Sequence, residues 1–423
     1  MSVTAEHVSI GPFLMDLRAA RLVRGDVEVE LRPQAFHVLE ALVQHSGEYL
    51  SYEQMLREAW RGTIVSHHTV AVTVGEVKKV LAEYGSWITH RPKLGYRLEV
   101  PKSEELSRKG WHCLSRHTRE GFERALECFE QAARENSADF RAFEGISSCY
   151  LLLGMYGMRP PREMYRGFLD AHQRAVRLGG LTPELRASHA CGLHIFERKF
   201  AEAEAELLQV QKEKPALVGG HVRLTMVYAT QGRLDDALEA LRLSRSMDSL
   251  LPSCPAAEVF LRLCRGEIEA AVASGKEAVD LFPFMPVSRS LYAEALETAG
   301  RAGEALREFR LACMACPDVA WLRALEGACL ARQGRRAEAS MILLELETTR
   351  QTDYVDAYFM ALLMNALGKR NEAFQELERA YEENSATLFL LDADPRMDCL
   401  RTDQRFTRLR NKLFGHLHSP AAA

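Results

Sequence analysis

Basic side chains gather in one stretch near the start of the chain. Residues 61–97 carry six Lys and Arg side chains against two Glu, a net charge of +4, whereas residues 1–60 carry five basic and nine acidic side chains, a net charge of −4. The six are Arg61, Lys78, Lys79, Arg91, Lys93 and Arg97. A local cluster of this kind is typical of a surface that contacts phosphates. The whole chain of 423 residues has a net charge of −4, so the pattern is local and not global.

The stretch from Ser66 to Lys79 contains two conflicting signals. Alternating β-branched residues at 69–74 are typical of a strand. However, Val70, Val74, Val77 and Leu81 have the spacing of the buried stripe of a helix. Ser66 is a suitable N-cap and no proline interrupts the run, so we expect a helix over residues 66–83.

The outward side of that helix would carry side chains that can contact DNA. Residues 68, 72, 75, 76, 79 and 83 lie opposite the apolar stripe, residues 67, 69 and 73 lie on its flanks, and small residues at 71 and 75 would allow a close approach. Hydroxyl, imidazole and ammonium groups there can reach phosphates or base edges in the major groove. Together with the basic residues of a following hairpin, the candidate DNA-binding residues are His67, His68, Thr69, Thr73, Glu76, Lys78, Lys79, Arg91, Lys93 and Arg97.

The segments around this helix must position it. "VSIGPFLMDL" and "RLVRGDVEVEL" predict short strands with turns around Arg18–Ala19 and Gly25–Asp26. "RPQAFHVLEALVQHSG" predicts a helix with a proline in its first turn, and "SYEQMLREAW" predicts a second helix that opens with a capping box of Ser51 and Gln54. Residues 87–100 predict a hairpin that turns near Pro92–Gly95.

Strands, three helices and a terminal hairpin make a winged helix. The segments "LRPQAFHVLEAL", "GEYLSYEQMLREAW", "TVAVTVGEVKKVL" and "GYRL" resemble, in order and spacing, the DNA-binding domain of OmpR/PhoB-type transcription regulators. The resemblance implies that the wing, with Arg91, Lys93 and Arg97, reaches the adjacent minor groove or backbone. Family members often carry Arg near the position of Glu76. A Glu repels phosphate but can accept from cytosine N4, so we expect modest phosphate affinity and a different base preference.

From about residue 184 the chain repeats itself with a period of 34 residues. The residues that keep this step are Ala203, Ala237, Ala271, Ala305, Ala339 and Ala373, with Gly232, Gly266, Gly300, Gly334 and Gly368. Each unit would be two antiparallel helices, the glycine ending the first in a left-handed conformation and the small alanine letting the second pack closely. Pro215, Pro283 and Pro317 would stop second helices. One unit cannot bury its apolar face alone, so the units should stack into a solenoid.

This pattern resembles tetratricopeptide repeats (TPR). Two earlier, irregular units fit at 107–137 and about 140–180, the second with the insertion "GMYGMRPPREM", which gives about eight units. The predicted fold is an α+β winged helix-turn-helix domain followed by an all-α TPR solenoid. The predicted boundaries are 1–101 for the winged helix, 102–385 for the solenoid, and 386–423 for a C-terminal capping helix and tail.

The rest of the sequence carries little that suggests other chemistry. It has no P-loop, nucleophile elbow, zinc-protease motif or Rossmann fingerprint, so we expect neither enzymatic activity nor a cofactor. His67 and His68 have no further His or Cys at a ligand spacing, and the C-x-x-C of Cys313 and Cys316 has no second pair, so we expect no metal. The start has no secretory signal and the most apolar run, 146–158, is too short to span a bilayer, which predicts a cytoplasmic protein without a membrane partner.

Two functions remain open. The resemblance implies a bacterial one-component transcription regulator, similar in plan to CadC/HilA-like regulators, which binds double-stranded DNA at tandem or inverted half-sites as a homodimer. Its repeats would sense a signal, dimerise, or recruit a protein or peptide partner such as RNA polymerase, with the partner or a small ligand in the concave groove. The alternative is a repeat-based interaction scaffold whose winged helix binds protein, not DNA. The salt dependence of duplex binding distinguishes the two.

Overall fold

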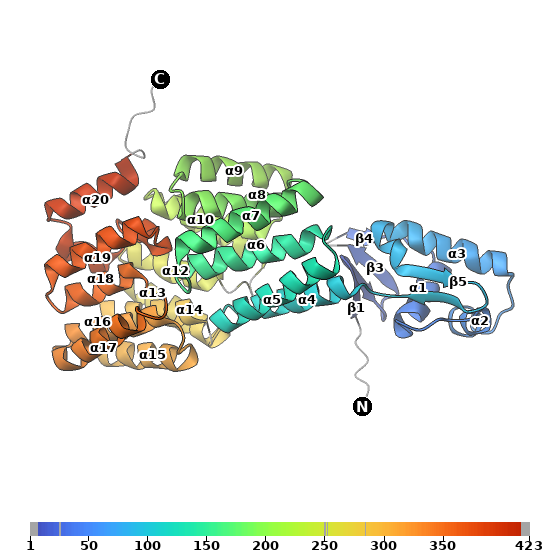
Figure 1. Ribbon diagram of the computed structural model, residues 1–423, viewed down its shortest axis with the longest axis horizontal. Coiled ribbons are helices and arrows are strands. Elements are labelled where there is room, and N and C mark those ends of the chain that lie inside the picture. Colours follow the sequence, from blue (N-terminus) through green and yellow to red (C-terminus); the bar gives the residue numbers. More distant parts are fainter. Residues whose placement is uncertain (1–6, 25–26, 249–250, 252, 284, 416–423) are drawn as a thin grey trace, which may run out of the picture. The chain divides into compact units, whose positions relative to one another are not determined.

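The computed structural model of the chain describes residues 7–24, 27–248, 251, 253–283 and 285–415 (Figure 1). It divides into two compact units, residues 1–108 and residues 109–423. Each unit is built around its own apolar core. No helix in the described residues is long and apolar enough to cross a membrane.

The first unit opens with a four-stranded antiparallel sheet in the order β1-β2-β3-β4. Its strands are β1 (His7–Ile10), β2 (Phe13–Asp16), β3 (Arg21–Arg24) and β4 (Val27–Val29). The predicted turn near Arg18 is present and is held by Asp16, whose carboxylate accepts from the backbone N–H groups of residues 18 and 19. The predicted turn at residues 25–26 lies outside the described residues.

One turn in this sheet was not predicted. Residues 8–17 contain a turn at Gly11, whose φ is +57°, besides the predicted turns. A Cβ at this position would lie 2.5 Å from the ring of Tyr84, so the tight turn also requires glycine for space. The short strands β1 and β2 therefore pair as a tight hairpin around Gly11.

Three helices and a hairpin complete the unit: α1 (Pro33–Gln44), α2 (Tyr52–Ala59), α3 (His67–Val80), the 3₁₀ helix η1 (Ala82–Trp87), β5 (Ile88–Arg91) and β6 (Gly95–Leu98). The proline in the first turn of α1 and the capping box of Ser51 and Gln54 are both as predicted. The segment before α2 also joins the hairpin, because the backbone of Leu50 exchanges hydrogen bonds with Tyr96 at 2.8 and 3.0 Å.

The conflict between strand and helix at residues 69–74 is resolved in favour of the helix. Val70, Val74, Val77 and Leu81 are all buried in the core of this unit. Burial of one such side chain contributes about 1.5–3 kcal/mol, whereas the whole β-propensity scale spans about 1 kcal/mol. Helix α3 ends at Val80, three residues before the predicted end, because Ala82 adopts a left-handed conformation with φ of +52° and starts η1.

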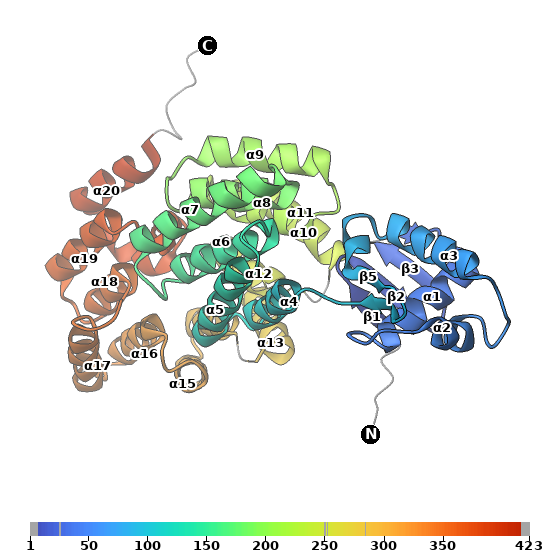
Figure 2. The ribbon, with the colours of Figure 1, turned by 45° about the vertical axis from the view of Figure 1, so that its right-hand side comes forward.

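The second unit consists of helices that pair in chain order (Figure 2). They are α4 (Lys102–Leu114), α5 (Arg119–Glu135), α6 (Phe140–Met155), α7 (Pro161–Gly179), α8 (Pro183–Ile195), α9 (Phe200–Glu213), α10 (Val218–Thr230), α11 (Leu234–Met247), α12 (Ser253–Cys264), α13 (Ile268–Leu281), α14 (Pro286–Thr298), α15 (Ala302–Ala315), α16 (Ala320–Arg332), α17 (Arg336–Thr349), α18 (Ala357–Ala366), α19 (Arg370–Glu382), η2 (Ala386–Leu390), η3 (Pro395–Leu400) and α20 (Gln404–Phe414). The unit boundary falls within α4, and the predicted insertion is the connection between α6 and α7 together with the first turn of α7.

The repeated residues have the predicted roles. All six repeated alanines lie in second helices and are fully buried. The five repeated glycines follow first helices with φ between +72° and +80°. Arg198, one period before Gly232, has a φ of +59°, so the same left-handed position is kept there without glycine.

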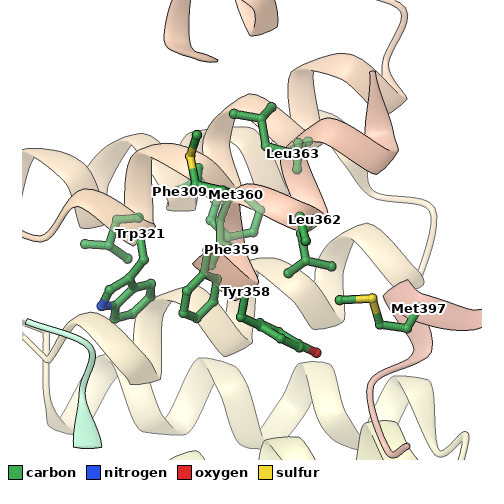
Figure 3. Packing of buried hydrophobic residues seen from close by; sticks show 14 of the residues in the cluster. Phe309, Trp321, Tyr358, Phe359, Met360, Leu362, Leu363 and Met397 are labelled. Atoms are coloured by element: carbon green, nitrogen blue, oxygen red, sulfur yellow. The ribbon is translucent and has the colours of Figure 1, made fainter. Parts of the chain in front are cut away.

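The end of the chain does more than cap the last repeat. Residues 386–400 run back over first helices: η2 contacts α6 and α8, the thiol of Cys264 in α12 approaches the backbone oxygen of Ala393, and Tyr358 in α18 donates to Asp394 at 2.6 Å. Figure 3 shows the apolar packing in this region, where Tyr358 and Met397 are buried and Trp321 stacks on Phe359. Residues 386–400 therefore cover part of the first helices of several units.

Candidate nucleic-acid interface

Helix α3 presents one face to solvent while its valine stripe packs inward. Ser66 caps the helix, accepting from the backbone N–H of Thr69 at 3.1 Å. On the outer face, Val72 is 51% exposed, His68 and Lys79 are exposed, and the space beside Gly75 is open to 4 Å. An exposed apolar side chain beside a glycine allows close contact with a groove, where a thymine methyl is an apolar partner.

The two threonines of the candidate site differ in position. Thr69 is exposed, and its hydroxyl lies 2.9 Å from that of Ser66. Thr73 is only 6% exposed, and its hydroxyl donates to the backbone oxygen of Thr69 at 2.9 Å. Thr73 follows Val70 by three residues and so lies on the buried side of the helix. Contact between Thr73 and DNA stays a prediction, and the buried, internally bonded hydroxyl does not favour it.

His67 and His68 occupy the first turn of α3. The ring of His67 stacks on Tyr52 with centroids 3.7 Å apart, and the Tyr52 hydroxyl donates to the backbone oxygen of Val65. These contacts tie the start of α3 to α2, and both His67 and His68 are exposed. Within the described residues, no group of three or more His, Cys, Asp or Glu side chains could hold a metal ion.

Glu76 has a partner that lies far away in the sequence. The Nε of Arg32, the residue before α1, donates to both carboxylate oxygens of Glu76 at 2.7 and 2.9 Å, and its Nη2 also contacts the carboxylate. Hydrogen bonds from Arg32 hold the pKa of Glu76 below its ordinary value, and Glu76 raises the pKa of Arg32. The side chain of Arg32 is 70% exposed, so it adds a cation to this face that sequence reasoning missed.

The wing is ordered by Tyr49 and Gly95. The guanidinium groups of Arg91 and Arg97 lie over the ring of Tyr49, 5.6 and 4.6 Å from its centroid. Arg97 also pairs with Glu99 and is mostly buried, so it supports the wing from within. At Gly95, with a φ of +103°, a Cβ would lie 1.9 Å from the backbone oxygen of Leu50, which explains the glycine.

The structure thus separates the predicted residues into two groups. The exposed group is His67, His68, Thr69, Lys79, Arg91 and Lys93. Glu76, Lys78 and Arg97 are partly exposed, and Thr73 is buried. In the part of the chain that the structure describes, the three lysines take part in no ion pair. Cations without internal partners are available to phosphates because no ion pair has to be broken first.

The C-x-x-C of the repeat region is not an exposed dithiol. Cys316 is buried and Cys313 is partly buried, and neither forms a disulfide. Burial raises the pKa of Cys313 to about 12 and that of Cys316 to about 11, so both thiols stay protonated near neutral pH. Their thiolate fraction is therefore low, as in structural cysteines.

Comparison with known proteins separates the two units. The family model "Transcriptional regulatory protein, C terminal" matches residues 26–98. The chain is 31% identical over 98 residues to the transcriptional activator CadC of Escherichia coli (strain K12), which covers 22% of this chain and 19% of CadC. It is 30% identical over 77 residues to the KDP operon transcriptional regulatory protein KdpE of the same organism, which covers 18% of this chain and 34% of KdpE. The chain therefore spans about a fifth and about a third of the length of these relatives.

Solved structures resemble the repeats. The human IFIT1 dimer with m7Gppp-AAAA has a TM-score of 0.52 and 18% identity, covering 82% of this chain and 90% of that chain. A thermophilic TPR protein of Thermus thermophilus has 20% identity and a TM-score of 0.38, covering 46% of this chain and 98% of that chain. At identities this low, the likeness to IFIT1 concerns the fold alone.

Proposed function

Since residues 26–98 form an OmpR/PhoB-type transcriptional regulatory domain and the rest of the chain is a TPR-type solenoid, we propose that this protein is a sequence-specific, DNA-binding transcription regulator. Helix α3 enters the major groove of promoter DNA, and the β5–β6 wing contacts the neighbouring backbone or minor groove. The repeat unit acts as a sensor, dimerisation or partner-recruitment module.

The observation that carries this proposal is the outer face of α3. It combines an exposed Lys79, an exposed Val72 and an open Gly75 on a helix whose other side is locked into the core. A helix that only stabilised the domain would not need a small residue and an exposed valine there. Both favour close approach to base edges.

The site residues take separate roles in this proposal. His68, Thr69 and Val72 lie toward the bases, while Lys78, Lys79, Arg91 and Lys93 neutralise phosphates. Glu76, oriented by Arg32, accepts from a cytosine N4 at a fixed position. His67 and Arg97 mainly position the helix start and the wing through Tyr52 and Tyr49.

Selection of the purified full-length protein against random duplexes tests the proposal. We expect one enriched sequence, with two half-sites if the protein binds as a dimer. Four phosphate contacts predict a slope of about −4 in log affinity against log salt. Enrichment with no shared sequence would contradict specific recognition, and the half-site spacing would report the dimer geometry.

An interaction scaffold is the second candidate. The observation that favours it is the exposure of apolar side chains around α3, because Ile64 is 87% exposed in addition to Val72. Such side chains also suit a protein surface. Absence of measurable duplex binding at about 50 mM salt would support this alternative, since phosphate attraction is strong there.

A further inference from the structure

Four large apolar side chains are exposed on two successive second helices of the repeat unit, α15 and α17. Leu311 and Met314 of α15 are 45% and 78% exposed, and Met341 and Leu344 of α17 are 72% and 65% exposed. Single exposed apolar side chains are ordinary on a protein surface, but four on neighbouring elements form a patch. Figures 1 and 2 both show α15 and α17 along the lower edge of the repeat unit, and α16 packs against both.

The four side chains point away from the core. They follow the buried alanine of their own helix, Ala305 or Ala339, by six and nine residues in α15 and by two and five residues in α17. At 3.6 residues per turn, all four lie within about 60° of the direction opposite that alanine. Both helices therefore present their apolar side chains on the outward side of the stack.

The repeat itself does not require apolar side chains at these positions. Of the four equivalent positions in each of α9, α11, α13 and α19, only Leu208 and Leu243 are large and apolar. The equivalents of Met341 are Glu239 in α11 and Gln375 in α19. Polar residues are thus compatible with the fold there, so the patch on α15 and α17 indicates an interface.

A chain of ion pairs holds α15 and α17 in a fixed arrangement. Nε of Arg310 on α15 donates to the buried Glu326 of α16 at 3.2 Å. Arg323 of α16 contacts the same carboxylate and also donates to both oxygens of Glu345 on α17, at 3.2 and 2.6 Å. The two helices are therefore ordered before a partner binds, which lowers the entropic cost of association.

Charge distinguishes the possible partners of this face. Within the described residues, the exposed charged side chains of α15 are Arg307 and Arg310, whereas α17 exposes Arg336 and the three glutamates Glu338, Glu345 and Glu347. One half of the face is thus basic and the other acidic. A uniformly acidic or uniformly basic partner would meet like charge on one half. A second copy of the chain, turned so that its α17 lies on α15 of the first, matches both halves at once.

We propose that the outer face of α15 and α17 is a self-complementary interface through which two copies of this chain form a two-fold dimer. Helix α15 of each copy packs on α17 of the other, so that the apolar residues bury one another and the arginines of α15 approach the glutamates of α17. Both helices have 14 residues. A helix of that length spans roughly 21 Å, so the interface is small and the dissociation constant should be micromolar. The inference names the surface for the dimerisation role proposed above and rests on that proposal.

Sedimentation equilibrium of the full-length protein without DNA tests the inference. Protein concentrations of about 1 to 100 μM bracket a micromolar dissociation constant, and the wild type should pass from monomer to dimer across them. Met341→Glu places a carboxylate in the apolar contact and should weaken dimerisation by about a hundredfold or more. Because Glu239 occupies the equivalent position of α11, this variant should fold, and its urea midpoint should match that of the wild type where both are monomeric.

Leu243→Glu is the matched control. Leu243 takes the place of Leu311 in α11 and is 40% exposed, but it lies outside the patch. The variant introduces the same charge at an equivalent position of the repeat, so it should dimerise like the wild type.

Charge reversal tests which helices meet. Arg307→Glu and Glu347→Lys should each weaken dimerisation by about tenfold, because each replaces an attraction between α15 and α17 with a repulsion. An equimolar mixture of the two variants should dimerise more tightly than either alone, since the mixed dimer restores opposite charges at positions 307 and 347 in both contacts.

Three results would overturn the inference. They are a wild type that stays monomeric up to about 100 μM, which would leave the face to another protein, a dimer that Met341→Glu leaves intact, and a mixture no tighter than the single variants. Duplex binding is measured separately, with one half-site. Half-site recognition by a monomeric wild type would remove this inference alone, whereas dimerisation without duplex recognition would remove only the proposed function.

Discussion

Arg32, the residue before α1, holds the carboxylate of Glu76 on α3 through its Nε at 2.7 and 2.9 Å. A glutamate on the face proposed to meet phosphates is therefore neutralised and oriented by a neighbouring cation. The pair lies 44 residues apart in sequence and connects the start of the first helix with the middle of the third.

The pair predicts the behaviour of Arg32→Ala. The substitution removes one cation and frees one anion on the same surface, so we expect duplex affinity to fall by about tenfold or more at low salt. The free energy of unfolding should change by less than about 1 kcal/mol, because the pair is exposed. Fluorescence anisotropy with the selected duplex, together with urea unfolding, measures both effects.

The double variant Arg32→Ala with Glu76→Gln serves as the control. It removes the freed anion and should recover part of the lost affinity at sites without a cytosine opposite Glu76. Equal affinities for Arg32→Ala and the wild type would show that this face does not approach the backbone.

Gly75→Ala separates folding from DNA contact. The position is in the interior of α3 with open space around it, so alanine should stabilise the domain by about 0.5–1 kcal/mol. If α3 lies in the groove, the added methyl group hinders close approach and duplex affinity falls. Urea unfolding and anisotropy on the same preparation give the two values. A gain in stability with unchanged affinity would place another face of the domain on the DNA.

Much of the fold could be predicted from local patterns. The winged helix followed by TPR-type repeats is confirmed. Both parts could be predicted because their sequence signals are short-range. The valine stripe identified α3, the Ser51–Gln54 box identified the start of α2, and the period of 34 residues identified the helical pairs. Such patterns arise from burial and capping, which act within a few residues.

The errors came from contacts that no local pattern records. The partner of Glu76 was missed because Arg32 lies in a different element. Thr73 was expected to reach DNA because the helical spacing puts it on a flank of the apolar stripe, whereas its hydroxyl donates within its own helix. The return of residues 386–400 over earlier first helices depends on the curvature of the whole stack, which the repeat period does not give.

His194 predicts a pH dependence of stability. Burial lowers its pKa to about 3, compared with about 6.5 for an exposed imidazole. Below about pH 6.5 the imidazole of His194 takes up a proton in the unfolded chain but not in the folded protein. The contribution of the neutral imidazole to the free energy of unfolding is therefore present at pH 7 and is lost as the pH falls toward 3. Between pH 7 and pH 5 the expected loss is about 2 kcal/mol.

His194→Gln isolates this contribution from other titrating groups. Burial raises the pKa of Glu144 and Glu294 to about 7, so these carboxyls have the opposite pH dependence and are present in both proteins. From pH 7 to pH 5 the free energy of unfolding of the wild type should therefore fall by about 2 kcal/mol more than that of the variant. Urea unfolding of both proteins at the two pH values measures this difference. The same difference between the two proteins at both pH values would contradict a neutral, buried His194.

Tyr358→Phe tests whether residues 386–400 hold the repeat unit together. The Tyr358 hydroxyl donates to the carboxylate of Asp394 at 2.6 Å, and Arg396 contacts both Asp394 at 2.8 Å and Glu294 at 3.2 Å (Figure 3 shows Tyr358). Loss of a buried hydrogen bond to a charged group should lower the free energy of unfolding by about 1.5–3 kcal/mol. Tyr354→Phe is the matched control, because it removes a buried hydroxyl that has no protein partner among the described residues and should cost little. Equal losses in the two variants, measured by urea unfolding, would mean that the contact between α18 and the returning segment does not contribute to stability.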